Sequence, residues 1–406
     1  MVERKEYIGV LRQWKDEQVI KVVTGLRRCG KSTLLQMFRD ELLKSGIPNE
    51  QIIFINFEDL AFEELLDYRK LYKYVCDKLI TDKMNYVFLD EVQLVPEYQK
   101  AVDSLQLQKN IDIYITGSNA YLLSGELATL LSGRYVEINM LPLSFSEYCK
   151  IKGNGDREKQ FADYMRYGSL PYIATLKDTT EQADIYLEGI YNTIIVKDIE
   201  LRQQRREKDP NKRRVNDITL LKNISKFLAN SIGSPISIKS ITNYISSNVK
   251  SVSQNTVGDY VEALVEPYLF YPIERYDVLG KNLLKQNCKY YISDLGIRRH
   301  LLPRSRYDFG FSLENLICLE LMRRGHTVNI GKVGTAEVDF VVRKGEDTEY
   351  YQVTASMTDE ATFNRELSPL RSISDNYPKT VLTLDRLTLG NYDGILVKNA
   401  IDWLVE

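Results

Sequence analysis

The stretch VIKVVTGLRRCGKSTLLQMF, residues 19–38, decides the fold of the first part of this chain. Its residues Gly25, Gly30, Lys31 and Ser32 satisfy the pattern G-x-x-x-x-G-K-[ST]. An apolar, β-branched run precedes the pattern and predicts a buried strand, and a leucine-rich run follows it and predicts a helix. A strand, a glycine loop and a helix are therefore expected in succession, which is the context that the pattern requires.

This combination predicts a cradle for phosphate groups. The two glycines let backbone N–H groups approach phosphate oxygens, and the helix N-terminus adds partial positive charge. Lys31 is expected to reach the β- and γ-phosphates, and the Ser32 hydroxyl to ligate Mg²⁺. ATP is expected as the nucleotide, since the base-reading pattern N-K-x-D of G proteins is absent. The loop residues expected to contact ATP are Gly25, Leu26, Arg27, Arg28, Cys29, Gly30, Lys31, Ser32 and Thr33.

A second hydrophobic strand, in YVFLDEVQ at 86–93, ends in two adjacent acids about 60 residues after the loop. In a run of alternating strands and helices, such a strand supplies the second half of a nucleotide-hydrolysis site. Asp90 is expected to hold the Mg²⁺, and Glu91 to orient or deprotonate the attacking water. The sequence thus predicts hydrolysis as well as binding.

The next expected strand, IDIYITGSN at 111–119, delivers Thr116, Ser118 and Asn119 to the same edge of the sheet, where the carboxyl ends of parallel strands form the ligand crevice. Asn119 is the preferred candidate for a contact to the γ-phosphate or the attacking water. A further candidate is Arg134, which precedes another strand, because an arginine near a γ-phosphate stabilises transition-state charge. Arg134 has three open interpretations: action in its own chain, action in a neighbouring copy, or a surface ion pair.

Four segments in this order carry a family resemblance: GLRRCGKST at 25–33, YVFLDEVQ at 86–93, ITGSNAYLL at 115–123 and SGRYVEINMLPLSFSEY at 132–148. They resemble a prokaryotic AAA+-type P-loop ATPase family whose uncharacterised C-terminal region resembles a winged helix followed by a restriction-endonuclease-like fold. The resemblance covers essentially the whole chain. It implies an α/β fold in which a parallel P-loop NTPase sheet with a helical lid precedes a winged helix and a nuclease-like α/β domain.

Four domains are expected from this plan. They are an AAA+-like ATPase core at 1–150, a helical lid at 151–205, a winged helix at 215–300 and a degenerate PD-(D/E)XK nuclease-like domain at 305–406. The basic run RQQRREKDPNKRR at 202–214 is either a phosphate-backbone contact or a solvated linker. The expected third helix of the winged helix opens at Ser253 and is polar but hardly basic, so DNA and a protein are both candidate partners.

The C-terminal part departs from the nuclease pattern that it resembles. Glu314, Glu337 and Asp339 supply carboxylates, but Gln352 and Thr354 stand where the pattern has an acid and a lysine. An amide gives a hard cation no negative charge, and threonine has no cationic head to place near a phosphate. An inactive nuclease-like fold is therefore expected, with weak metal binding by the three carboxylates left open.

The composition excludes several classes of protein. The 406 residues exceed one ordinary core, and the net charge of −2 does not point to nucleic acid or a membrane. Five scattered cysteines without a CxxC pair argue against a zinc site or a disulfide framework, and two histidines leave little room for His-based chemistry. No apolar run approaches the roughly 20 residues of a membrane span, so a cytoplasmic protein is expected.

The leading prediction is an ATPase that couples its nucleotide state to the winged helix and the nuclease-like domain, acting on DNA or a protein partner, alone or as a homo-oligomer. The first alternative is a slow nucleotide-dependent signalling switch. The second is a DNA-binding protein that is regulated by ATP. A third is a magnesium-dependent nuclease, against which the residues at positions 352 and 354 argue.

Overall fold

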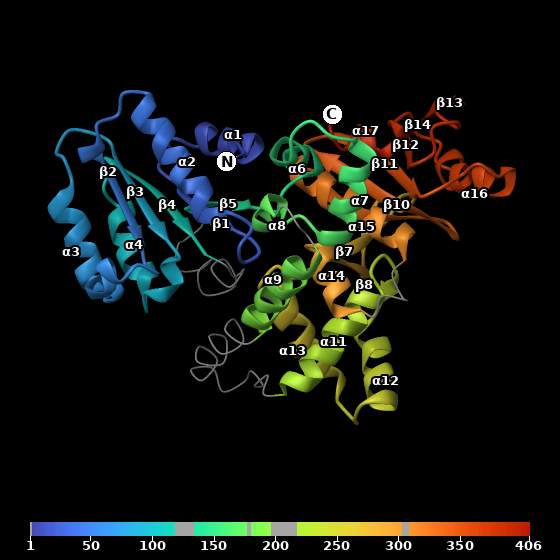
Figure 1. Ribbon diagram of the computed structural model, residues 1–406, viewed down its shortest axis with the longest axis horizontal. Coiled ribbons are helices and arrows are strands. Elements are labelled where there is room, and N and C mark those ends of the chain that lie inside the picture. The colour runs from blue at the N-terminus through green and yellow to red at the C-terminus, as the bar shows by residue number, and fades with distance from the viewer. Residues whose placement is uncertain (1, 118–133, 177–179, 196–216, 303–307) are drawn as a thin grey trace. The chain divides into compact units, whose positions relative to one another are not determined.

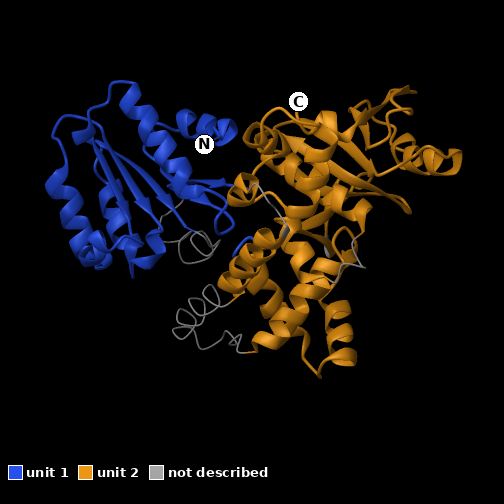
Figure 2. Cartoon of the chain, in the orientation of Figure 1, with its two compact units in different colours: residues 1–141, 266–268 blue, residues 142–265, 269–406 orange. Residues whose placement is uncertain are grey.

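The computed structural model describes residues 2–117, 134–176, 180–195, 217–302 and 308–406. They form two compact units (Figure 2). Unit 1 comprises Met1–Leu141 and Glu266–Tyr268, and unit 2 comprises Pro142–Val265 and Leu269–Glu406. The basic run at 202–214 and the candidate Asn119 lie outside the described residues.

Unit 1 is built around a five-stranded parallel sheet (Figure 1). Its strands are β1 (Ile20–Thr24), β2 (Ile52–Asn56), β3 (Asn85–Asp90), β4 (Ile111–Thr116) and β5 (Tyr135–Asn139). Its α-helices are α1 (Lys5–Gln13), α2 (Lys31–Lys44), α3 (Tyr68–Lys78) and α4 (Tyr98–Gln106). Short 3-10 helices are η1 (Asn49–Gln51), η2 (Leu60–Leu66) and η3 (Val92–Leu94).

The strand order in unit 1 is β2-β3-β4-β1-β5. Strand β4 therefore lies between β1, which leads into the phosphate loop, and β3, which ends at Asp90. Because all five strands run parallel, their carboxyl ends meet at one edge, where α/β sheets bind ligands. This parallel sheet with its helices is the P-loop NTPase fold that the sequence predicts.

The alternating side chains of the strands bury both faces of this sheet. On one face Val22, Leu89 and Ile113 pack with α3 and α4 through residues such as Leu71 and Leu105. On the other face Phe38 of α2 packs its ring against Phe88 and Tyr114, whose ring centroids lie 6.4 and 5.2 Å away. The helices on both faces hold the strand ends, and with them the candidate site, in a fixed arrangement.

Unit 2 begins with helices and continues into a mixed sheet (Figure 1). Its helices are α6 (Phe145–Lys152), α7 (Arg157–Tyr167), α8 (Pro171–Thr175), α9 (Thr180–Thr193), α11 (Ile218–Asn230), α12 (Ile238–Asn248), α13 (Gln254–Val265), α14 (Leu295–Leu301), α15 (Phe309–Arg323), α16 (Glu360–Arg371) and α17 (Ala400–Trp403). Its strands are β6 (Pro235–Ile236), β7 (Phe270–Asp277), β8 (Asn282–Ile292), β9 (Thr327–Val333), β10 (Ala336–Lys344), β11 (Asp347–Thr354), β12 (Lys379–Thr383), β13 (Gly390–Tyr392) and β14 (Ile395–Asn399).

A single nine-stranded sheet runs through unit 2 in the order β13-β14-β12-β11-β10-β9-β7-β8-β6. The hairpin β7–β8 joins the rest of the sheet because β7 pairs in parallel with β9, with Arg275 beside Ile330. The hairpin that the sequence assigns to the winged helix and the strands that it assigns to the nuclease-like domain therefore belong to one sheet. The domain boundaries expected at 151, 215 and 305 all lie inside unit 2.

Three helices and the hairpin occur in the order that the sequence predicts, as α11, α12, α13 and then β7–β8. Ser253 accepts a hydrogen bond from the N–H of Thr256 over 3.1 Å, as expected of a residue that caps a helix. The short strand β6 adds a third strand by pairing with β8. The winged-helix assignment of this region stays a prediction. None of the described helices is long and apolar enough to cross a membrane.

Candidate nucleotide-hydrolysis site

The phosphate loop connects β1 to α2, and its backbone has positive φ angles at two glycines. Gly25 and Gly30 have φ values of 138° and 107°, in the region that favours glycine. The Lys31 side chain is buried, and its Nζ donates to the carbonyl oxygens of Gly25 and Leu26 over 3.1 and 3.2 Å. The lysine head is thus held inside the loop, where a bound phosphate would compete with these carbonyls for the same ammonium group.

Two hydroxyl groups converge on the carboxylate of Asp90. The Ser32 hydroxyl, at the start of α2, donates to Asp90 Oδ1 over 3.0 Å, and the Thr116 hydroxyl, at the end of β4, donates to the same oxygen over 2.5 Å. Burial raises the pKa of Asp90, whereas these two hydrogen bonds act in the opposite direction. Asp90 and Ser32, which the sequence expected at one magnesium site, do lie together.

Glu91 follows the strand directly and has a left-handed backbone, with a φ of 55°. This conformation costs free energy in a residue with a Cβ, and such strain is concentrated at functional sites. The backbone N–H of Glu91 donates to Thr116 Oγ1 over 2.9 Å, and its carboxylate accepts from the Gln93 amide over 2.5 Å. These contacts fix the direction in which the Glu91 side chain leaves the strand.

The structure gives Thr116 a larger part in this site than the sequence predicts. The sequence places it among three polar residues at the end of its strand, of which Asn119 is the preferred candidate. In the sheet register Leu89 pairs with Ile115, so Asp90 and Thr116 are the next residues of their strands. The sequence does place Thr116 as the last residue of its strand. This position indicates a contact with Asp90 only once β4 is known to lie beside β3.

Replacing Thr116 with Val is expected to weaken magnesium-dependent nucleotide turnover by about tenfold, as is typical when a residue that orients a metal ligand is lost. The change keeps the shape of the side chain but removes both the donor to Asp90 and the acceptor for Glu91 N–H. A Mg²⁺ titration of the ATPase rate measures the effect. An unchanged titration curve in a variant with the parent's melting temperature would contradict this role.

Arg134 is exposed and immediately precedes β5. Its carbonyl accepts from the N–H of Ile20, and Ile20 pairs with Tyr135, so Arg134 lies at the start of the strands. The phosphate loop leaves the other end of β1 after Thr24, which at the rise of an extended strand is roughly 15 Å away. The parallel register therefore separates Arg134 from the phosphate loop of its own chain.

The donor set of the site fits a magnesium ion. A hydroxyl and a carboxylate are the hard oxygen ligands that Mg²⁺ prefers, and Ser32 and Asp90 supply one of each within 3.0 Å. Asp90 Oδ2 is buried without a hydrogen-bond partner among the described residues, which leaves this oxygen for a metal or its water. Ser32 and Asp90 would hold the ion, and the loop from Gly25 to Thr33 the phosphates.

The second candidate site, in unit 2, contains a cation that the sequence did not reveal. Lys289 of β8 pairs with Glu314 over 3.1 Å and with Glu337 over 2.9 Å, and its side chain is 4% exposed. Tyr291 donates to the same Glu314 oxygen over 2.6 Å. Burial lowers the pKa of Lys289, but Glu314, Asp339 and Glu337 together outweigh it and raise that pKa above its ordinary value.

The other expected residues of this site, Asp339, Gln352 and Thr354, make hydrogen bonds to the backbone or to a neighbouring carboxylate. Asp339 accepts from the N–H of Val353 over 2.8 Å, and Gln352 donates its amide to Glu366 over 2.9 Å. Burial and the charge of Glu314 raise the pKa of Asp339 well above its ordinary value. Thr354 donates to a backbone carbonyl two residues on. Among the described residues, no group of three or more His, Cys, Asp or Glu side chains is arranged to hold a metal.

The fold and the site of unit 1 define a P-loop ATPase of the AAA type, and comparison with known proteins agrees. Residues 17–149 match a family model described as an AAA domain. Residues 158–308 match a model described as a domain of unknown function (DUF8612). The AAA match spans the phosphate loop, Asp90, Glu91 and Thr116, which are the residues that build the site.

The chain belongs to a prokaryotic family of AAA-type P-loop ATPases with an uncharacterised C-terminal region. A protein of Haemophilus influenzae described as uncharacterized is 37% identical to it over 411 residues, covering 100% of this chain and 99% of that protein. An uncharacterized protein of Methanocaldococcus jannaschii is 30% identical over 372 residues, covering 86% of this chain and 77% of that protein. Among solved structures, a Walker-type ATPase of Pyrococcus abyssi aligns with a TM-score of 0.48 and 15% identity, covering 74% of this chain and 96% of that one.

Proposed function

We propose that unit 1 binds ATP with Mg²⁺ and hydrolyses it, and that the nucleotide state controls what unit 2 does to a DNA or protein partner. The observation that carries the proposal is the convergence of Ser32 and Thr116 on the buried carboxylate of Asp90, beside the phosphate loop and Glu91. These groups come from three elements, α2, β3 and β4. Burying a carboxylate costs folding free energy, so its presence at this point supports a functional role for Asp90.

Each residue has a defined part in the proposed reaction. The ammonium of Lys31 exchanges the carbonyl oxygens of Gly25 and Leu26 for phosphate oxygens. The loop N–H groups and the N-terminus of α2 add positive potential around the same oxygens. Ser32 and Asp90 would hold Mg²⁺, which would supply positive charge to offset that of the phosphates. Glu91 accepts the proton of the attacking water or orients that water, and the amide of Gln93 holds its carboxylate.

Nuclease activity of unit 2 is not part of this proposal. Lys289 forms ion pairs with Glu314 and Glu337, and the amide of Gln352 donates a hydrogen bond to Glu366. The carboxylates that a nuclease would turn toward a metal are thus engaged with a buried lysine and with the backbone. This arrangement supports a structural use of the cluster.

Replacing Lys31 with Ala tests the proposal and is expected to abolish ATP binding and hydrolysis. The matched control is Lys44→Ala, which removes an exposed lysine from the last turn of the same helix. Binding is measured by titration of a fluorescent ATP analogue, and turnover by phosphate release. If the Lys31→Ala protein bound ATP with the parent's affinity, the phosphate loop would not be the nucleotide site.

Partner dependence is tested separately by measuring the ATPase rate with added DNA at low and at high salt. A contact to the phosphate backbone predicts stimulation that disappears as salt rises. The absence of stimulation and of binding at low salt would rule against DNA and favour a protein partner.

A further inference from the structure

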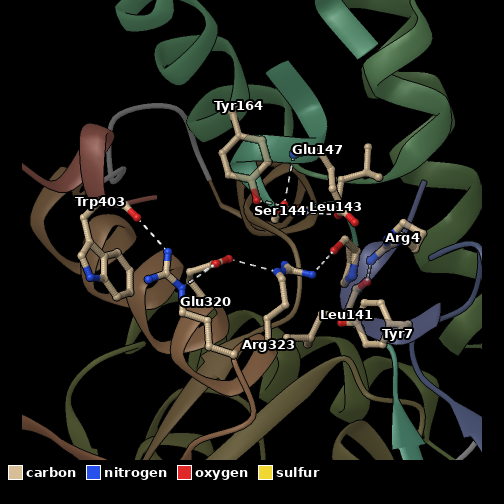
Figure 3. Close-up of polar contacts among 12 residues, drawn as sticks. Arg4, Tyr7, Leu141, Leu143, Ser144, Glu147, Tyr164, Glu320, Arg323 and Trp403 are labelled. Atoms are coloured by element: carbon tan, nitrogen blue, oxygen red, sulfur yellow. Dashed lines mark hydrogen bonds and ion pairs between the residues drawn. The ribbon is translucent and has the colours of Figure 1, made fainter. Parts of the chain in front are cut away.

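Leu141, the last residue of the N-terminal part of unit 1, is held by side chains from the start of the chain (Figure 3). Its N–H donates to the hydroxyl of Tyr7 over 3.0 Å, and its carbonyl accepts from Arg4 Nη2 over 2.7 Å. Both backbone hydrogen-bonding groups of Leu141 are therefore satisfied by α1 and the residue before it. The next residue, Pro142, belongs to unit 2.

The same arginine also contacts the phosphate loop. Arg4 Nη1 donates to the carbonyl oxygen of Cys29 over 3.1 Å, and the side chain is almost completely buried, with 3% of the residue exposed. Its guanidinium lies over the Tyr7 ring, 5.0 Å from the centroid. A guanidinium is planar, so its two terminal nitrogens hold the two carbonyls, one from the loop and one from Leu141, at a fixed separation.

The phosphate loop and Met140, the residue before Leu141, are in close backbone contact. The N–H of Met140 donates to the carbonyl of Thr24 over 2.8 Å. A Cβ on Gly25 would lie 2.1 Å from the Met140 carbonyl oxygen, so only glycine allows this approach. A shift of the loop backbone therefore acts on residues 140–141 by contact as well as through Arg4.

On the unit 2 side, the residues after Leu141 are bound just as completely. The Pro142 carbonyl accepts from Arg323 Nη1 over 2.8 Å. The Leu143 carbonyl accepts from the hydroxyl of Tyr164 over 2.7 Å, and Ser144 caps α6 through a capping box (Figure 3). The chain thus leaves unit 1 and enters unit 2 without a stretch of unbound backbone between residues 141 and 144.

We propose that Arg4 is a positioning residue that transmits the state of the phosphate loop to the start of unit 2. The inference rests on the proposed function of the loop. Phosphate oxygens compete for the ammonium of Lys31, so ATP changes the hydrogen bonds that Lys31 makes to Gly25 and Leu26. Arg4 passes the resulting shift at Cys29 to Leu141, and the bound backbone after Leu141 passes it to α6 and to Arg323 on α15. By linkage, a partner that binds unit 2 alters ATP affinity by the same factor.

Hydrogen exchange of the full chain with and without ATP tests this inference. In the parent, ATP is expected to change exchange in the loop at 25–33 and also at 139–147 and in α15. In the Arg4→Met protein the change is expected to persist in the loop and at Met140, which contacts Gly25 directly, and to disappear in α15. The rate at saturating ATP, kcat, is expected to stay at the parent value.

Arg12→Met is the matched control, because Arg12 lies on α1, the helix that begins directly after Arg4, but pairs with Glu41 at the surface, over 2.5 Å. It is expected to leave every ATP-dependent change intact. If Arg4→Met does not fold, Arg4→Lys keeps the charge without the planar fork and is expected to at least halve the change in α15.

The outcomes separate this inference from the proposed function. If ATP left exchange in the loop of the parent protein unchanged, the proposed function would fail. If ATP altered the loop while an Arg4 variant kept the parent's response in α15, or if the parent itself had no response there, the role of Arg4 would be overturned.

Discussion

Replacing Glu91 with Gln is expected to leave ATP affinity unchanged and to lower the rate of hydrolysis by about 100-fold or more, the usual contribution of a general base. Gln keeps the size of the side chain and its hydrogen bond to Gln93, but it cannot accept the proton of the attacking water. The backbone strain at φ 55° stays the same, so the variant changes the chemistry and not the fold. Phosphate release at saturating ATP measures the rate, and titration with a fluorescent ATP analogue measures the affinity.

Glu97→Gln is a matched control for this experiment. Glu97 also has a left-handed backbone, with a φ of 57°, and it begins the helix that follows, but its side chain pairs with Lys100 at the surface. This variant is expected to hydrolyse ATP at the parent's rate. If Glu91→Gln also did so, the base would have to be another group, and Glu91 would be only a strained residue at the end of β3.

Much of the site in unit 1 was predictable because its chemistry is encoded locally. The glycines, Lys31 and Ser32 lie within one short segment, and the acid pair follows one hydrophobic strand. The contact between Ser32 and Asp90 joins residues far apart in the sequence, yet it follows from the rule that parallel strands present their carboxyl ends at one edge.

What could not be predicted in unit 1 depends on strand order. No local pattern places β4 between β1 and β3, and this order is what brings Thr116 to Asp90. The same sheet register places Arg134 at the start of β5, away from the loop. Of the three interpretations of Arg134, action in its own chain is therefore the one that the sheet register does not favour, and its role stays a prediction.

In unit 2 the unpredicted features come from one long-range pairing. The helices α11, α12 and α13 and the hairpin follow from amphipathic and alternating patterns. The parallel pairing of β7 with β9 has no such signal, since it joins segments more than fifty residues apart. This pairing extends the sheet and brings Lys289 of the hairpin to Glu314 and Glu337. The motif lysine is absent at position 354, and a lysine from another strand lies among the carboxylates.

Replacing Lys289 with Met is expected to destabilise unit 2 by about 3–5 kcal/mol, the usual effect of removing one member of a buried ion pair. Glu314, which is 7% exposed, would keep its hydrogen bond from Tyr291 but lose the charge that offsets its burial. The pKa of Lys289 is raised in the folded protein, so its contribution is complete below the ordinary lysine pKa and is lost only as pH rises through the higher folded value. The destabilisation is therefore expected to be the same at pH 6 and pH 9, measured by denaturant unfolding.

Two further variants show whether the charge of Lys289 is responsible. Lys398→Met removes a lysine whose pair with Glu406 is exposed, and it is expected to change stability by less than about 1 kcal/mol. Adding Glu314→Gln to Lys289→Met removes the unpaired charge and is expected to restore part of the lost stability. If Lys289→Met unfolded at the parent's denaturant concentration, or if the double variant were no more stable than the single one, the cluster would not act as a charge-balanced support of the sheet. Restoration in the double variant would mean that the positive charge of Lys289 balances the buried carboxylate of Glu314 and so supports this part of the sheet.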